Sequence, residues 1–291
     1  MKRNIIMSLI VSTLFGCSLA SCIVGTGQRI DPGEKKSFTT DELLSLNNVT
    51  FDTSGDYTGI LASGNVWLHI AQGDSFTVRA EGMENLVVML AIHQHSSDRH
   101  LLEIALQEKW NLIMKEHHPV DVYITMPRLE RVEATNAATV HVESPLTTES
   151  LTIKGSGASS LRFASVDCEG NLSVVGSGAI KMEAEQLSAH RISFNAKGAS
   201  DVDIRAMACD SVELNVIGAS EIECDKLTAD HTFSRVSGAS DIDIRFENSG
   251  AAKFEVSGAS DVKLSGTLKD LDTESQGASN IDKKNLKITG F

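Results

Sequence analysis

The 291-residue sequence is poor in aromatic residues, in proline and in positive charge. Only 5% of the residues are aromatic and only 4 are proline, whereas 22 are glycine, a balance that favours many short turns over a helical enzyme with a large pocket. The 26 basic residues face 39 acidic ones, which argues against binding to nucleic-acid phosphates or to an anionic membrane surface. The 41% hydrophobic content still supports one or two packed domains.

The first 21 residues have the pattern of a secretory signal peptide. Lys2 and Arg3 precede an apolar stretch over residues 5–15, which is too short to span a bilayer. Removal of this segment leaves 24 basic residues against 39 acidic ones, so the mature chain would carry a net charge of −15.

The end of this segment resembles a bacterial lipobox. Ala20 and Ser21 stand directly before Cys22, and in a lipobox such a cysteine is diacylated and becomes the first residue of the mature chain. A competing site at Cys17 has the bulky Phe15 where a small residue is usual. We therefore predict lipidation at Cys22 and a membrane anchor that does not span the bilayer.

The second half of the sequence is a repeat built on Gly-Ala pairs. The pairs begin at Gly157, Gly178, Gly198, Gly218, Gly238, Gly258 and Gly277. They recur with a nearly constant period of about 20 residues, and a period of this kind indicates a solenoid. We interpret these glycines as structural corners of successive coils.

Alternating apolar residues stand on both sides of each corner, as expected for β-strands. A third, weaker apolar segment leads to the next copy, at Val166, Leu187, Met207 and Leu227. The pattern predicts an all-β, three-sided parallel β-helix with about 20 residues per coil. Leucine-rich repeats, left-handed hexapeptide helices and calcium-binding nonapeptide repeats all fit the spacing less well.

Two blocks before the repeat resemble a known family. The run 65–82 (NVWLHIAQGDSFTVRAEG) looks like the opening hairpin of the family called putative auto-transporter adhesin, head GIN domain, and the run 120–132 (VDVYITMPRLERV) looks like its second block. The resemblance covers about residues 50–290 and implies a right-handed β-solenoid in the bacterial cell envelope. It carries no catalytic residues. The sequence departs from the family at Asn136-Ala137-Ala138, which replaces the first Ser-Gly-Ala, and at Lys283, where an inward apolar residue is expected.

The sequence thus divides into four parts. Residues 1–21 form the signal peptide, 22–46 a tether, 47–130 an N-terminal β cap with the first turns, and 131–291 a repeat solenoid continuous with the cap. In the cap, alternating runs such as 66–70, 76–80, 102–106 and 120–124 predict antiparallel or irregular strands. A solenoid needs such a cover, because its open end exposes unpaired backbone groups.

Acidic residues recur at one outward position of four consecutive coils, namely Asp201, Glu221, Asp241 and Asp261. A second column is expected beside them at Asp203, Glu223 and Asp243. A divalent cation could offset the repulsion within the first column, but exposed carboxylates cost little in water, and we favour a solvated surface without a metal.

Other candidate sites are weak. The pairs His93/His95 and His117/His118 lack the cysteine or carboxylate company of a zinc site, so we interpret them as surface-loop residues. The serines of the Gly-Ala-Ser corners have no activating histidine and are expected to hydrogen-bond local backbone groups.

The remaining cysteines are predicted to be free thiols. Cys168 and Cys209 occupy the same position two coils apart, about 9.6 Å from each other, beyond disulfide reach. Cys224 occupies an inward position elsewhere on the coil. We expect all three to act mainly as small buried hydrophobic residues.

The function predicted from the sequence is that of a non-enzymatic, lipid-anchored module of the cell envelope, at the outer membrane. It would serve binding, adhesion or structure, without a cofactor, through contact with a protein or a glycan; both ligand classes and both sides of the membrane stay open. The alternative is a polysaccharide-active β-helix enzyme. Arg205 and Arg245 recur on alternate coils without a converging basic cluster, which argues against that alternative.

Overall fold

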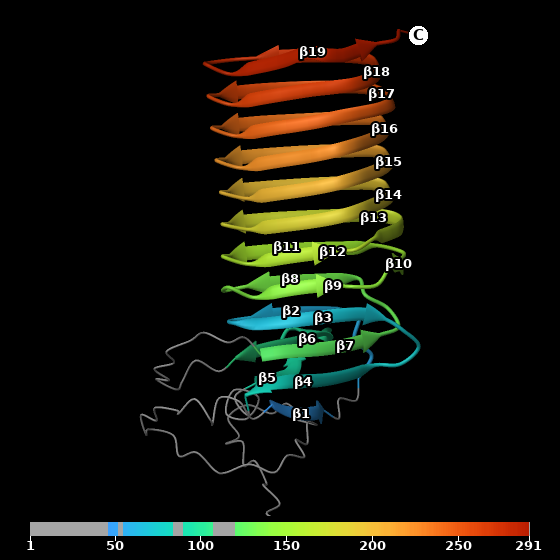
Figure 1. Ribbon diagram of the computed structural model, residues 1–291, viewed down its shortest axis with the longest axis vertical. Coiled ribbons are helices and arrows are strands. Elements are labelled where there is room, and N and C mark those ends of the chain that lie inside the picture. The colour runs from blue at the N-terminus through green and yellow to red at the C-terminus, as the bar shows by residue number, and fades with distance from the viewer. Residues whose placement is uncertain (1–45, 52–54, 84–89, 107–119, 291) are drawn as a thin grey trace, which may run out of the picture.

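The computed structural model describes residues 46–51, 55–83, 90–106 and 120–290. All regular elements in these ranges are β-strands, stacked along one axis into a β-solenoid of about eight turns with roughly 20 residues each (Figure 1). The predicted all-β solenoid is therefore confirmed. None of the described segments is a helix long and apolar enough to cross a membrane.

The shaft consists of parallel strands that pair with the strand one turn away. Its elements are β8 (Arg131–Thr135), β9 (Thr139–Val142), β10 (Leu146–Thr148), β11 (Leu151–Gly157), β12 (Ser160–Phe163), β13 (Val166–Gly178), β14 (Lys181–Gly198), β15 (Asp201–Gly218), β16 (Glu221–Gly238), β17 (Asp241–Gly258), β18 (Asp261–Ser275) and β19 (Asn280–Ile288). From β14 to β17 each residue pairs almost throughout with the equivalent position of the next repeat, so Val202, Ile222 and Ile242 lie directly above one another.

Burial along each long strand shows the three sides of a turn. In β16 the alternation of buried and outward residues is interrupted at 225–226 and again at 230–231, where two neighbouring residues both face outward. With the Gly-Ala corner, these interruptions divide the turn into three short sides. The inward positions of this turn are Ile222, Cys224, Leu227, Ala229, Thr232, Ser234 and Val236.

The N-terminal strands do not stack in chain order. They are β1 (Leu46–Phe51), β2 (Gly59–Ser63), β3 (Val66–Gln72), β4 (Thr77–Met83), β5 (Leu90–His95), β6 (Asp98–Leu106) and β7 (Val120–Met126). The turn formed by β2 and β3 lies between β8–β9 on one side and β6–β7 on the other, and all four of these ladders are parallel.

The predicted strand direction in this region is correct for only part of it. β1 pairs with β4, β4 with β7 and β5 with β6, all antiparallel. The predicted antiparallel direction is wrong for β3, which pairs only with parallel strands. It is also wrong for the ladders that join β6 and β7 to the turn formed by β2 and β3. Alternation fixes which face of a strand is buried but not the direction of its neighbour, which explains the error.

Most of the corner serines are buried and point into the shaft, namely Ser159, Ser200, Ser220, Ser240 and Ser260. Ser220 and Ser240 are buried, and their hydroxyls donate to the carbonyls of Gly198 and Gly218 in the preceding turn, over 3.4 and 3.2 Å. The same hydroxyl of Ser240 accepts a hydrogen bond from the backbone amide of Ser220. The predicted local hydrogen bonds are present at Ser260 and Ser279, whose hydroxyls donate to the carbonyls of Ser257 and Gln276 over 3.3 and 2.8 Å. At Ser220 and Ser240 the hydroxyl bonds to the preceding turn instead, because the side chain faces the core.

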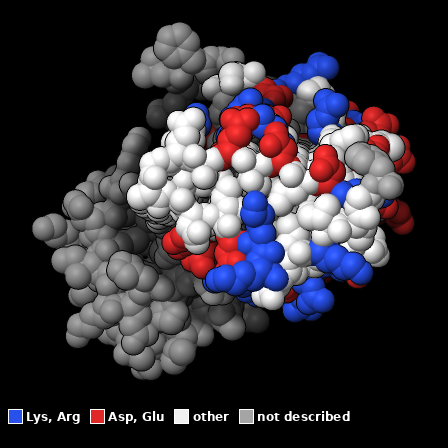
Figure 2. All heavy atoms as spheres, turned by 90° about the horizontal axis from the view of Figure 1, so that it is seen from above, with Lys and Arg blue, Asp and Glu red and all other residues white. Residues whose placement is uncertain are grey.

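The C-terminal turn is the least buried part of the shaft. Lys283 is exposed at the place where an inward residue stands in earlier turns, and Ile288 is 48% exposed. Seen from this end, acidic and basic side chains share the surface (Figure 2). Charged residues on an edge strand oppose pairing with other chains.

Candidate functional site

Polar and aromatic side chains gather on one outward face near the N-terminal end of the shaft. His69 on β3 is in direct register with Tyr123 on β7 and with His141 on β9. Since facing residues of neighbouring parallel strands project to the same side, the three rings form one column. Asp121 and Glu143 flank this column, and we call the five residues the basal cluster.

His69 is the centre of the basal cluster. Its Nδ1 lies 2.7 Å from Oε1 of Glu143 and its Nε2 lies 2.9 Å from Oδ1 of Asp121. Burial lowers the pKa of His69, but the hydrogen bonds to Asp121 and Glu143, with their charges, outweigh burial and raise the pKa above its usual value. The ring also stacks on Tyr123, with centroids 4.7 Å apart and planes inclined by 16°.

His141 has the opposite electrostatic setting. Burial, followed by the positive charges of Arg162 and His69, lowers the pKa of its imidazole, which favours the neutral ring. Its ring meets that of His69 edge to face, with centroids 5.8 Å apart. The two histidines of one column are therefore pushed toward different protonation states.

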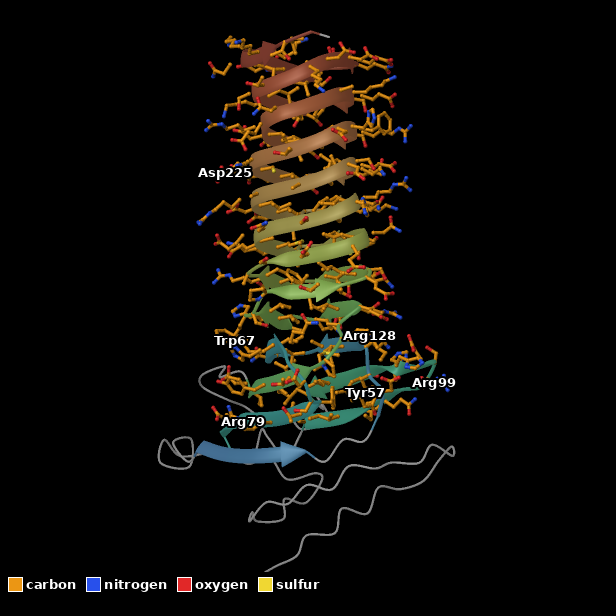
Figure 3. The ribbon with its side chains drawn as sticks, turned by 90° about the vertical axis from the view of Figure 1, so that its right-hand side faces the viewer. Tyr57, Trp67, Arg79, Arg99, Arg128 and Asp225 are labelled. Atoms are coloured by element: carbon orange, nitrogen blue, oxygen red, sulfur yellow. The ribbon has the colours of Figure 1, made fainter. Side chains whose placement is uncertain are left out.

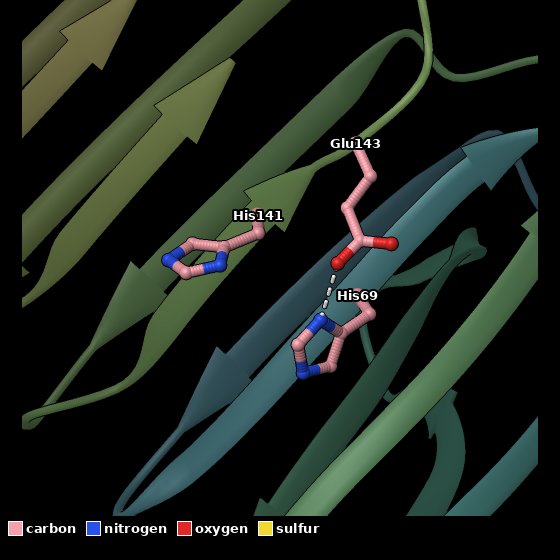
Figure 4. A group of neighbouring side chains, drawn as sticks. All are labelled: His69, His141 and Glu143. Atoms are coloured by element: carbon pink, nitrogen blue, oxygen red, sulfur yellow. Dashed lines mark hydrogen bonds and ion pairs between the residues drawn. The ribbon is translucent and has the colours of Figure 1, made fainter. Parts of the chain in front are cut away.

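Three side chains of the basal cluster could hold a metal ion. One ligand atom each from His69, His141 and Glu143 lies within 4.8 Å of the others (Figure 4). Within the described ranges this is the one group of three or more such residues that converges. Sequence reasoning missed it, because the two histidines are far apart in the chain. The available signal was the spacing of two residues between His141 and Glu143.

An aromatic and cationic surface surrounds the basal cluster. Trp67 is 41% exposed and its ring lies 6.3 Å from that of His141. The guanidinium of Arg79 lies 4.4 Å from the centre of the Tyr123 ring, a cation–π contact. Trp67 and Arg79 project from the same side of the shaft in Figure 3. This face thus combines a flat exposed ring with hydrogen-bonding groups.

The acidic column forms as predicted. Asp201, Glu221, Asp241 and Asp261 are in successive register and exposed, with Lys181 before the first of them and Asn280 after the last. In the neighbouring column, burial and then the charges of surrounding carboxylates raise the pKa of Glu223. The donor atoms of the first column do not converge as those of the basal cluster do.

Calcium should therefore not stabilise the fold more than other salt does. We expect millimolar calcium chloride and sodium chloride of matched ionic strength to raise the melting temperature equally, because both only screen the column. Asp241→Asn should be neutral or slightly stabilising, since it removes one repelling charge. Differential scanning calorimetry checks both; a calcium-specific rise that Asp241→Asn abolishes would identify the column as a cation site.

All seven corner glycines adopt positive φ, from 72° at Gly157 to 122° at Gly218. Asn136 and Ala137, which replace the first glycine, also have positive φ, at 53° and 69°. Asparagine is one of the few other residues that tolerates this region, so the corner persists without glycine. The sequence analysis missed a further corner of the same kind at Gly64, with φ of 83°.

The other predicted residues lie apart from the basal cluster. Cys168, Cys209 and Cys224 are free, and burial raises the pKa of Cys209 and of Cys224 to about 12. His93 and His95 lie on β5 instead of a loop. Cys22, with the signal peptide, and His117/His118 lie outside the described residues.

Comparison with known proteins identifies the family. The model of the family described as "Putative auto-transporter adhesin, head GIN domain" matches residues 56–230 and 212–290. The chain belongs to this family. No functionally curated protein matches the chain.

Solved structures share the head GIN fold. A crystal structure of a putative adhesin from Parabacteroides distasonis is 19% identical, with a TM-score of 0.70 over 82% of this chain and 97% of that one. One from Parabacteroides merdae is 17% identical, with a TM-score of 0.69 over 82% and 96%. A structure from P. distasonis described as a putative lipid binding protein is 13% identical, with a TM-score of 0.63 over 82% and 96%. At these identities the likeness concerns the fold.

Proposed function

We propose that the protein is a non-enzymatic adhesion module, anchored to the outer membrane through a lipidated Cys22, which binds a glycan on the face around the basal cluster. The family and the adhesin descriptions of its structural neighbours support a binding role in the cell envelope. The observation that carries the proposal is the exposed Trp67 beside imidazole and carboxylate groups on a flat sheet face.

The chemistry of this face suits a sugar ring. A pyranose has an apolar C–H face, which packs on an aromatic ring, and a rim of hydroxyls, which donate to carboxylates and accept from imidazole or guanidinium groups. Trp67 supplies the ring, Glu143 has a side chain that is 55% exposed, and Arg79 has one that is 41% exposed. Sugar hydroxyls could thus find charged partners on the same face as the indole.

Trp67→Ala should weaken glycan binding by about tenfold or more, which corresponds to at least about 1.4 kcal/mol, because an aromatic anchor is lost. The measurement is binding of the mature chain to a glycan panel, followed by titration of the best ligand. Ile217→Ala is the matched control, since Ile217 is another exposed large apolar residue, 50% exposed, on a different part of the shaft.

The same panel tests the alternative function. Reducing-end release is assayed beside binding, and an adhesion module should bind a glycan without shortening it. Cleavage would favour the polysaccharide-active enzyme, and equal binding by wild type and Trp67→Ala would remove the proposed face as the contact.

Cys22→Ala should release the protein from the membrane fraction and abolish fatty-acid labelling, because no thiol would remain for acylation at the lipobox. Labelling of whole cells followed by fractionation measures this, with Cys168→Ala as the control that leaves the lipobox intact. Labelling that persists in Cys22→Ala would move the site to Cys17.

The anchor would attach at the same end of the shaft as the basal cluster. β1 begins at Leu46 at this end (Figure 1). The chain between Cys22 and Leu46 spans at most roughly 80 Å when fully extended. The tether would therefore join the shaft at the end that carries the proposed binding face.

A further inference from the structure

The basal cluster has the donor set of a transition-metal site. Imidazole nitrogen and carboxylate oxygen are the ligands of many catalytic zinc ions, with bonds of about 2.0–2.2 Å. Such bonds place neighbouring donor atoms roughly 3.3–3.5 Å apart in tetrahedral geometry. Nδ1 of His69 and Oε1 of Glu143 are 2.7 Å apart, and all three donors lie within 4.8 Å, so small side-chain rotations reach this spacing. We propose that His69, His141 and Glu143 bind one divalent transition-metal ion, with zinc as the typical case.

The groups behind the donors support this assignment. Metal-bound histidines usually donate their second ring N–H to a carboxylate, which fixes the tautomer and the ring orientation. Asp121 accepts from Nε2 of His69 over 2.9 Å, which leaves Nδ1 directed at Glu143. The stacked ring of Tyr123 holds the imidazole plane from the neighbouring strand. A metal ion would replace the proton that Nδ1 donates to Glu143, while Asp121 and Tyr123 already hold the orientation of the ring.

The local charges also favour a cation. Glu143 and Asp121 bring two carboxylates to the cluster, and Arg162, which is in register with His141, is paired with Glu183, with Nε 2.7 Å from Oε2. An ion held by three protein ligands keeps one position open. Because the side chain of Glu143 is 55% exposed, this position would face solvent and admit water or an external ligand.

The ion would join two turns that the chain connects only through a long excursion. His69 belongs to β3, whereas His141 lies on β9 and Glu143 directly follows it. This is the next turn in space, although β4 to β8 intervene in the chain. A metal bound to both turns stabilises the folded state relative to the unfolded chain, in which the donors are scattered. The site would thus hold the out-of-order β2–β3 turn against the shaft.

The test is zinc titration of the mature chain after treatment with a chelator, by calorimetry and by thermal denaturation. We expect one equivalent to bind saturably and to raise the melting temperature by several degrees. His141→Ala and Glu143→Gln should each weaken this binding at least tenfold, and Asp121→Asn should weaken it about 10–100-fold through the orientation of His69.

His190→Ala is the matched control, because His190 is an exposed histidine whose Nδ1 lies 2.8 Å from Asp210, far from the cluster. It should leave zinc binding unchanged. Cobalt replaces zinc as a spectroscopic probe: a visible absorption band typical of four-coordinate cobalt should appear in wild type and vanish in His141→Ala, which reports on ligation even if a variant is less stable.

The outcomes separate this proposal from glycan binding. Trp67→Ala should keep the equivalent of zinc, since the indole supplies no ligand, even where it loses the glycan. No saturable zinc binding by wild type, or unchanged binding in both His141→Ala and Glu143→Gln, would overturn the metal site and leave the glycan proposal standing.

Discussion

Gly218→Val should lower the melting temperature by more than about 10 °C, since it costs several kcal/mol in a chain for which each kcal/mol shifts the midpoint by roughly 2–4 °C. Gly218 has a φ of 122°, which a β-branched residue tolerates poorly. A Cβ at this corner would also collide with the backbone carbonyl of Gly198 in the preceding turn. Because Gly238 stacks in register on the other side, the corner cannot shift away from either neighbour without breaking a ladder.

The adjacent corner residue provides the control for this variant. Ala219 is exposed, and its amide donates to the carbonyl of Gly198 over 2.7 Å, a bond that valine keeps. Ala219→Val adds apolar volume at the same corner, but position 219 is not in the left-handed region. We therefore expect the melting temperature to change by a few degrees at most. Circular dichroism during heating measures both variants, and a wild-type midpoint for Gly218→Val would refute the steric role of the corner.

Much of the shaft could be predicted from the sequence because its requirements are local and repeated. Each corner needs a residue at positive φ, so glycine recurs once per turn, and each side of a turn needs inward apolar residues at every second position. The repeat period of about 20 residues also predicts correctly that Asp201 and Glu221 are in register and that Cys168 lies two turns from Cys209. One repeat therefore specifies its neighbours.

The order of the N-terminal turns could not be predicted in this way. The turn containing β2 and β3 has its corner at Gly64, but no second copy of the corner lies one period away in the sequence to reveal it. Its neighbouring strands come from residues 98–126 and 131–142. Which of these two groups lies on which side depends on how well the complete strands pack and pair with each other. Such a choice is made by tertiary packing, which leaves no periodic trace.

The basal cluster was hidden for the same reason. The histidines that stand out in the sequence, His93/His95 and His117/His118, are neighbours in the chain, whereas His69 and His141 become neighbours only when β3 pairs with β9. In the sequence, a single histidine in an alternating strand pattern is indistinguishable from any other outward-facing residue. It can be recognised as part of a site only when the register between the two distant strands is known.

The second large effect should be a gain in stability, from Thr232→Val combined with Ser234→Ala. Both side chains face the interior of the β16 turn, and their hydroxyls have no hydrogen-bond partner in the described structure. Removing a buried hydroxyl without a partner should stabilise the fold by about 1–3 kcal/mol. Valine nearly matches the volume of threonine, so the first change leaves no cavity.

The surroundings of the two hydroxyls explain why the gain should appear. Thr232 lies in register between Val212 and Ala252, and Ser234 between Leu214 and Phe254, so each hydroxyl is placed in an apolar column.

Ser240→Ala is the matched control. Ser240 is also a buried serine of the shaft, but its hydroxyl donates to the carbonyl of Gly218 and accepts from the backbone amide of Ser220. It should cost about 1 kcal/mol, because it leaves the carbonyl and the amide without that partner. Denaturant unfolding of the double variant, of Ser234→Ala alone and of Ser240→Ala measures the difference. The same change of serine to alanine should therefore stabilise at position 234 and destabilise at position 240, and equal losses at both would mean that Ser234 has a bonded partner after all.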